Sequence, residues 1–243
     1  LAAAQGGLTS ESPTPTNLEQ EPKVWSGNVD GGLTMVSGNS ESTTGSVNAK
    51  ASRTWGAWAA GVYAGYTGVR STNAVTGDAT TTSRIITAGA DGRRYLDANN
   101  NLYVFVKAGD RRDEPSGLVE RMDLGGGVGY KFDLYENAFL GLEGGVSWVT
   151  EELVGVTDDE STAAARVSYL LEAPLVENLN AFGNGEYLNG GDVESFTSLT
   201  GLRWNFRPKW SLMASIQFNY DGSPAPGFED TDTIFVLGIG LEF

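Results

Sequence analysis

The side chains best suited to chemistry in this sequence are charged residues that recur at alternate positions of short segments. Fourteen of them share one polar face of the elements predicted below: Asp30, Lys50, Arg93, Lys107, Arg111, Asp123, Lys131, Glu143, Arg166, Glu172, Glu186, Arg203, Asp232 and Glu242. Both signs are present, so these groups can pair with one another in a confined, wet interior. Such an interior is either a selective pore lined by charge or a core plugged by ion pairs.

Catalytic and metal chemistry is strongly limited, because the chain contains no Cys and no His. Without Cys there is no disulfide, thiolate metal site or thiol nucleophile. Without His there is no Ser-His-Asp machinery and no imidazole-bound zinc. A carboxylate pair acting as acid and base remains open, but no spacing singles one out. We therefore expect no catalytic residue, no cofactor and no metal ion.

Carboxylates also cluster in two connecting segments, at Glu151, Glu152 and 158–160, and at Asp221, Glu229, Asp230 and Asp232. Carboxylate oxygens bind Ca²⁺ or Mg²⁺. Neither cluster has the alternate ligand spacing with a central Gly that an EF-hand loop needs. We interpret both clusters as solvated acidic loops.

The overall composition excludes other classes of protein. The 243 residues include 16 Lys and Arg against 31 Asp and Glu, a net charge of −15, and no basic stripe. A nucleic-acid partner, which requires clustered positive charge, is not expected. No apolar run approaches the ~18 to 20 residues of a transmembrane helix, whereas membrane β-strands need only ~9–11 residues with one apolar face.

The elements that carry the charges have the two-residue period of β-strands. In the last segment Phe235, Leu237, Ile239 and Leu241 share one face, opposite Gly238 and Gly240. The same rule predicts twelve strands, at about 24–37, 42–54, 57–70, 80–95, 101–113, 118–132, 138–150, 161–175, 179–189, 193–206, 209–221 and 231–243. Short connections between strands alternate with connections that are mostly longer. This pattern predicts an all-β, closed, antiparallel up-and-down barrel of about 12 strands.

The two faces of the strands distinguish a membrane barrel from a soluble one. A membrane barrel turns its apolar face outward and carries aromatic girdles at both interfaces, and a soluble barrel does the reverse. The apolar face has aromatic residues near strand ends: Trp25, Trp58, Tyr66, Tyr130, Phe132, Trp148, Trp204, Phe206, Trp210 and Tyr220. This pattern favours a transmembrane barrel over residues 24–243, and the soluble barrel is the alternative. Residues 1–23, with Pro13, Pro15 and Pro22, are expected to form a flexible periplasmic tail or the remnant of a signal peptide.

Two stretches resemble a known family. They are the opening 25–43, with Ser-Gly-Asn at 37–39, and the closing 219–243, with Pro-Ala-Pro-Gly at 224–227 and Thr-Asp-Thr at 231–233. Together they resemble the salt-stress-induced outer membrane protein family (YdiY-like), which has no assigned activity. The resemblance implies a small outer-membrane barrel of a diderm bacterium. The sequence departs from the family pattern at Glu229 and Asp230, where a basic residue is expected before Thr-Asp-Thr.

The expected role follows from the barrel fold and from the absence of histidine in the sequence. The twelve-stranded outer-membrane phospholipase relies on a histidine base, so a similar lipid-cleaving activity is the weakest hypothesis. We expect a non-catalytic, structural or envelope-stress role with a largely filled lumen, within a larger envelope assembly; the alternative is a narrow channel for small solutes. The expected partners are outer-membrane lipid and the barrel-assembly machinery, for which the terminal Phe243 is the expected signal.

Overall fold

Twelve β-strands make up the computed structural model, which describes residues 25–36, 41–72, 78–113, 117–155, 160–191, 193–223 and 230–242. The strands are β1 (Ser26–Val36), β2 (Glu41–Trp55), β3 (Trp58–Thr72), β4 (Ala79–Tyr95), β5 (Leu102–Asp113), β6 (Leu118–Tyr135), β7 (Ala138–Leu153), β8 (Glu160–Val176), β9 (Leu179–Gly190), β10 (Val193–Arg207), β11 (Trp210–Asp221) and β12 (Thr231–Glu242). Among these residues there is no helix long and apolar enough to cross a membrane.

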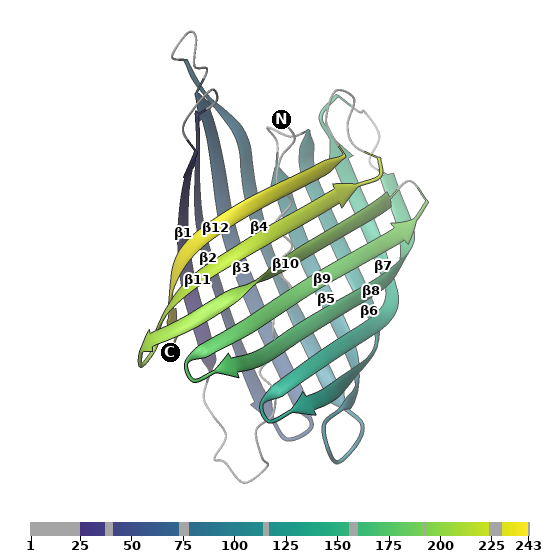
Figure 1. The fold of residues 1–243 in the computed structure, drawn as a ribbon. Coiled ribbons are helices and arrows are strands. Elements are labelled where there is room, and N and C mark those ends of the chain that lie inside the picture. Colours follow the sequence, from purple (N-terminus) through teal and green to yellow (C-terminus); the bar gives the residue numbers. More distant parts are fainter. Residues whose placement is uncertain are drawn as a thin grey trace.

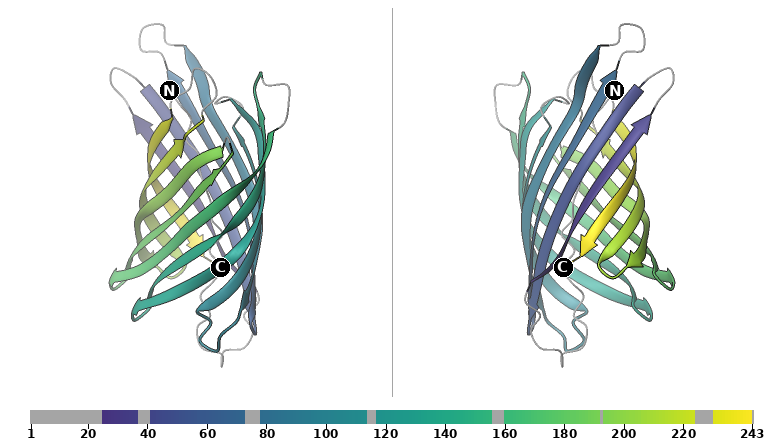
Figure 2. Two further views of the ribbon diagram at one scale, coloured as in Figure 1. Left: turned by 90° about the vertical axis from the view of Figure 1, so that its right-hand side faces the viewer. Right: turned by 90° about the vertical axis from the view of Figure 1, so that its left-hand side faces the viewer.

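The strands form one closed antiparallel barrel in which each strand pairs with its neighbours in the sequence (Figure 1). Closure is made by β1 and β12, with Asn28 opposite Glu242 and Gly32 opposite Gly238. Because every strand has two partners, the sheet has no free edge. The strands are steeply tilted around the wall, as the two side views in Figure 2 show.

The predicted fold class is confirmed. The ends of each predicted strand lie within three residues of the ends of an observed strand. The largest differences are at β6 and β7, which extend to Tyr135 and Leu153. Strand pairing continues there beyond the clear alternation of polar and apolar residues, because backbone hydrogen bonds alone can prolong a hairpin. Glu151 and Glu152 therefore lie in β7. Glu160 lies in β8, Asp221 in β11 and Asp232 in β12, so the assignment of these five residues to acidic loops is wrong.

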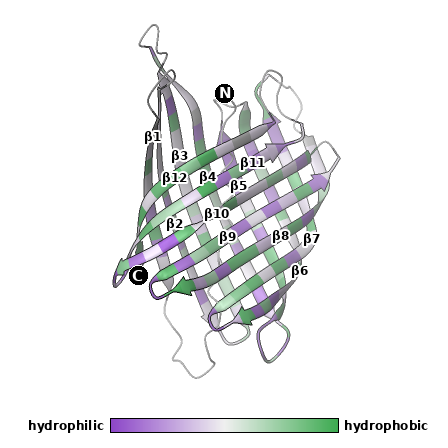
Figure 3. Cartoon of the chain, in the orientation of Figure 1, coloured by the Kyte–Doolittle hydropathy of each residue, from purple (hydrophilic) through white to green (hydrophobic). Residues whose placement is uncertain are grey.

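Apolar and polar residues alternate along the strands (Figure 3). The apolar set points outward and is exposed, as at Leu124, Val146 and Val167, which are 60%, 66% and 56% exposed. The polar set points into the lumen and is more buried, as at Lys107 and Arg166. This distribution is the reverse of a soluble barrel, so the soluble alternative does not describe this protein.

Short turns gather at the end of the barrel where the chain leaves β12, the lower end in Figure 1. Three of these turns place Asn137, Asn178 and Lys209 in the left-handed region, with φ of 60°, 65° and 70°. A register shift lies beside each of them. A turn followed by a left-handed residue and a bulge is a common hairpin connection, and Asn accepts that conformation better than Lys does.

Lys209 is therefore a site where stability can be gained. Replacing Lys209 with Asn is expected to raise the free energy of unfolding by about 0.5–1 kcal/mol, because left-handed backbone is costly for residues other than Gly and Asn. Urea unfolding of the barrel in lipid vesicles, followed by tryptophan fluorescence, measures the change. Lys209→Ala is the control, since Ala has no such preference. An equal gain in both variants would contradict the explanation.

Candidate functional site

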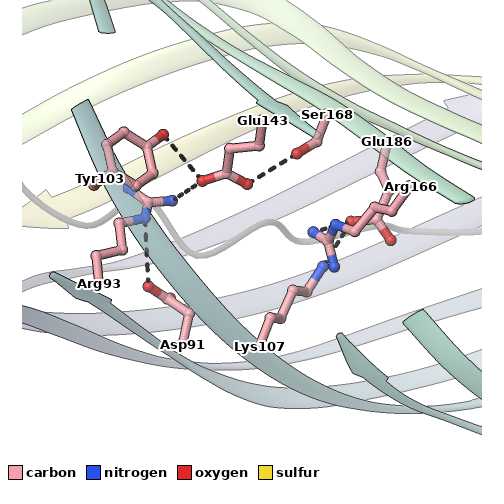
Figure 4. Close-up of polar contacts among 8 residues, drawn as sticks. All are labelled: Asp91, Arg93, Tyr103, Lys107, Glu143, Arg166, Ser168 and Glu186. Carbon is pink, nitrogen blue, oxygen red and sulfur yellow. Dashed lines mark hydrogen bonds and ion pairs between the residues drawn. The ribbon is translucent and has the colours of Figure 1, made fainter. Parts of the chain in front are cut away.

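One wall of the lumen, formed by β4 to β9, carries a network of paired charges, and Glu143 is the centre of its first part (Figure 4). Its Oε1 lies 3.0 Å from Arg93 Nη2, and the Tyr103 hydroxyl donates to the same oxygen at 3.1 Å. The Ser168 hydroxyl donates to Oε2 at 2.9 Å. The Arg93 guanidinium also lies over the Tyr103 ring, and Arg93 Nε is 3.9 Å from Asp91 Oδ2. Both oxygens of this carboxylate are therefore satisfied.

A second part of the network is centred on Glu186. Its Oε2 lies 2.7 Å from Lys107 Nζ and 2.5 Å from Arg166 Nη2. The Arg166 side chain is 1% exposed and its guanidinium lies over the Phe105 ring. One carboxylate thus neutralises part of the charge of two cations that come from different strands (Figure 4).

Further ion pairs continue the network toward both ends of the barrel. Arg121 pairs with Glu151 and lies 3.7 Å from Asp221, near the end with the longer connections. Toward the short turns, Arg203 Nη1 lies 3.6 Å from Glu172 Oε1, and Lys131 lies 3.0 Å from Asp133. Buried charges are tolerated where they are paired, and these pairs therefore stabilise the charged residues that form them.

A cavity of about 110 Å³ lies in the lumen on the other side of the barrel. Most of its lining comes from β1 to β3 and β10 to β12, where small residues such as Gly32, Ser46 and Ser215 leave room. Three charged residues line it, namely Asp30, Lys50 and Arg203. The lumen therefore has one wall filled by ion pairs and one wall that borders open space.

The structure places the predicted lumen residues in several groups. It brings together Arg93 with Glu143, Lys107 and Arg166 with Glu186, and Arg203 with Glu172. Half-buried positions on the lumen face are taken by Asp30, Lys50, Arg111, Asp123 and Lys131. Glu242 is opposite Asn28 and exposed at the rim. Three of the predictions lie outside the described part of the chain: the side chain of Asp232, Phe243 and residues 1–23.

Several residues of the network were not predicted. Asp91 and Arg121 stand two positions before Arg93 and Asp123, so the same alternation contained the signal for both. Glu151 was missed because it was assigned to a loop. Tyr103 and Ser168 carry no charge, and only the fold places their hydroxyls on Glu143.

The predicted aromatic residues lie on the outer surface. Trp25, Trp58, Tyr66, Tyr130, Phe132, Trp148, Trp204, Phe206 and Trp210 are between 38% and 56% exposed, and Tyr220 is half-buried. Trp58 begins β3, and Trp204, Phe206 and Trp210 flank the short turn at 208–209. Toward the other end lie Trp148 and Tyr220.

Among the described residues, no three Asp or Glu side chains approach closely enough to hold a metal ion. The carboxylates of the lumen instead accept hydrogen bonds from Arg, Lys, Tyr and Ser. The site can donate hydrogen bonds to polar groups and accept hydrogen bonds from them.

Comparison with known proteins gives a family match but no function. Residues 29–243 match the family model described as "Protein of unknown function, DUF481". No curated protein matches the chain. The resemblance to the salt-stress-induced family consequently stays a prediction.

Solved structures with this fold include outer-membrane channels and translocators. The outer membrane channel from Pseudomonas putida F1 is 10% identical, with a TM-score of 0.55 over 94% of this chain and 100% of its own. The translocator domain of autotransporter NalP from Neisseria meningitidis is 14% identical, with a TM-score of 0.52 over 93% and 91%. The NanC porin is 10% identical, with a TM-score of 0.50 over 89% and 98%. At these identities the likeness concerns the fold alone.

Proposed function

Because this chain belongs to the DUF481 family, described only as proteins of unknown function, we propose a role from its own lumen: a narrow passage for small polar solutes across the outer membrane. The single observation that carries the proposal is the cavity beside the ion-pair network. A passage needs polar walls, so that a solute can exchange water for protein contacts, and it needs free space. This lumen has both.

The ion pairs determine the width and the ion selectivity of the passage. Lys107, Arg166 and Glu186 narrow one side. Together with the Arg93–Glu143 and Arg121–Glu151 pairs they leave no large excess of either sign on that wall. Unlike a ring of equal charges, such a wall excludes neither anions nor cations strongly. We therefore expect low conductance with weak ion selectivity.

Location in the outer membrane is part of the proposal. An apolar outer surface with exposed aromatic side chains suits contact with lipid. The even number of strands puts the start of β1 and the end of β12 at the same end of the barrel, which we assign to the periplasm with the short turns.

Planar-bilayer recording of the purified protein tests the passage. We expect stable unitary openings, reduced at least severalfold by Ser46→Phe, because Ser46 lines the cavity. The matched control is Val47→Phe, since Val47 is the next residue, points outward and is 54% exposed. Complete electrical silence of the wild-type protein, or equal loss in both variants, would refute the passage.

A second candidate is the non-catalytic structural role, which the ion-pair network favours. A wall of buried, paired charges makes a rigid barrel that can serve in a larger envelope assembly whether or not it conducts. The expected partners are membrane lipid and the barrel-assembly machinery. A silent barrel that co-purifies in fixed proportion with another envelope protein after mild detergent extraction would favour this candidate.

A further inference from the structure

We infer that the lumen cavity binds a neutral, hydroxyl-rich small solute, of the size of a monosaccharide or a polyol. The inference deepens the proposed passage and rests on the same cavity. It depends on three properties of the lining: its hydrogen-bonding groups, its aromatic faces and the partners that its charged residues already have.

Most hydrogen-bonding side chains of the lining are neutral, among them Ser46, Asn48, Thr67, Thr87, Ser215 and Gln217. Hydroxyl and amide groups both donate and accept, as sugar hydroxyls do. A solute with several hydroxyls can therefore satisfy many of them at once.

Asn184 gives the most direct indication of a ligand. This side chain lines the cavity and is only 6% exposed, and its Oδ1 has no hydrogen-bond partner among the described residues. In the conformation described, the oxygen itself is closed off from the cavity. Because buried acceptors in folded proteins are nearly always satisfied, we expect the amide to turn about its last side-chain bond when a solute enters, so that a solute hydroxyl donates to this oxygen.

Two aromatic rings border the same space, from strands six places apart in a barrel of twelve, and hence from opposite walls. They are Tyr63 of β3 and Phe182 of β9. The Tyr63 ring lies against Gly89, where any Cβ would collide with it. Aromatic faces provide a rigid apolar surface that suits the C–H face of a sugar ring.

Each charged residue in the lining already has a partner within the protein. Arg203 lies 3.6 Å from Glu172 and over the Phe182 ring, and Asp30 accepts a hydrogen bond from Asn28. Lys50 also has an interaction partner. A charged solute would have to break these contacts or enter without a counter-charge, whereas a neutral solute does neither.

Isothermal titration of the detergent-solubilised barrel tests the inference without relying on conduction. D-glucose serves as the neutral probe, and D-glucuronate, the same ring with a carboxylate, as the charged one. We expect saturable glucose binding, weaker glucuronate binding, and about tenfold weaker glucose binding by Asn184→Leu, the effect of one lost hydrogen bond.

Asn205→Leu is the matched control, because Asn205 Oδ1 also lacks a partner among the described residues but does not line the cavity. Tighter binding of glucuronate than glucose, or equal weakening by both Asn variants, would overturn the inference. A barrel that conducts but does not bind glucose would also overturn the inference, and it would leave the proposed passage intact. Glucose binding to a silent barrel would support the inference and refute the passage.

Discussion

Replacing Glu186 with Gln is expected to lower the free energy of unfolding by about 3 kcal/mol, the low end of the cost of leaving buried charges without their partner. Glu186 Oε2 is 2.7 Å from Lys107 Nζ and 2.5 Å from Arg166 Nη2. Gln keeps the shape of the side chain and removes its charge. Lys107 and Arg166 are then left as two cations in one buried region, where they repel each other.

The same substitution is expected to change ion selectivity if the lumen conducts. Two uncompensated cations attract anions, so the reversal potential in a salt gradient should shift toward that of chloride. Urea unfolding in vesicles measures the stability, and bilayer recording measures the reversal potential.

Glu242→Gln is the matched control, because Glu242 is on the same lumen register but exposed at the rim. A change within about 0.5 kcal/mol is expected for this exposed site. If Glu186→Gln is as stable as the control, the ion-pair network does not hold the wall together.

Replacing Gly127 with Ala is expected to cost about 2–3 kcal/mol, the range for overpacking a closely fitted site. Gly127 of β6 is opposite Gly145 of β7. A Cβ at Gly127 would collide with the Gly144 carbonyl oxygen and lie 2.7 Å from the Gly145 Cα. Both neighbours are backbone atoms of the paired strand, so the clash can be relieved only by separating β6 from β7.

Gly144→Ala is the matched control for this prediction. Gly144 is on the paired strand, and a Cβ there meets no atom of the described residues within 4 Å. Its stability should change by less than about 0.5 kcal/mol in the same urea unfolding experiment. Equal losses in the two variants would mean that general glycine flexibility, and not the close approach of the strands, explains the effect.

Most of the fold could be predicted from the sequence, because side-chain direction in a strand alternates with every residue. Phe235, Leu237 and Ile239 against Gly238 and Gly240 were enough to place β12 and its outer face. Only the structure identified Gly127 and Gly145 as the pair whose backbones approach too closely for a Cβ.

The candidate site was predicted in its composition but not in its pairing. The alternation put Lys107 and Glu186 on the lumen face, yet they are 79 positions apart in the chain. No local rule relates two such positions, because the tilt and stagger of the strands determine which of them meet across the lumen.

The sequence by itself determined that the barrel has about twelve strands, which face turns inward, and that His- or Cys-based catalysis is absent, since these follow from residue type and a two-residue period. The tertiary structure alone decided that the charges pair along one wall and that open space remains beside Asp30, Lys50 and Arg203. The reason is that ion pairs and cavities depend on distances between distant strands, and those distances are set only when the sheet closes.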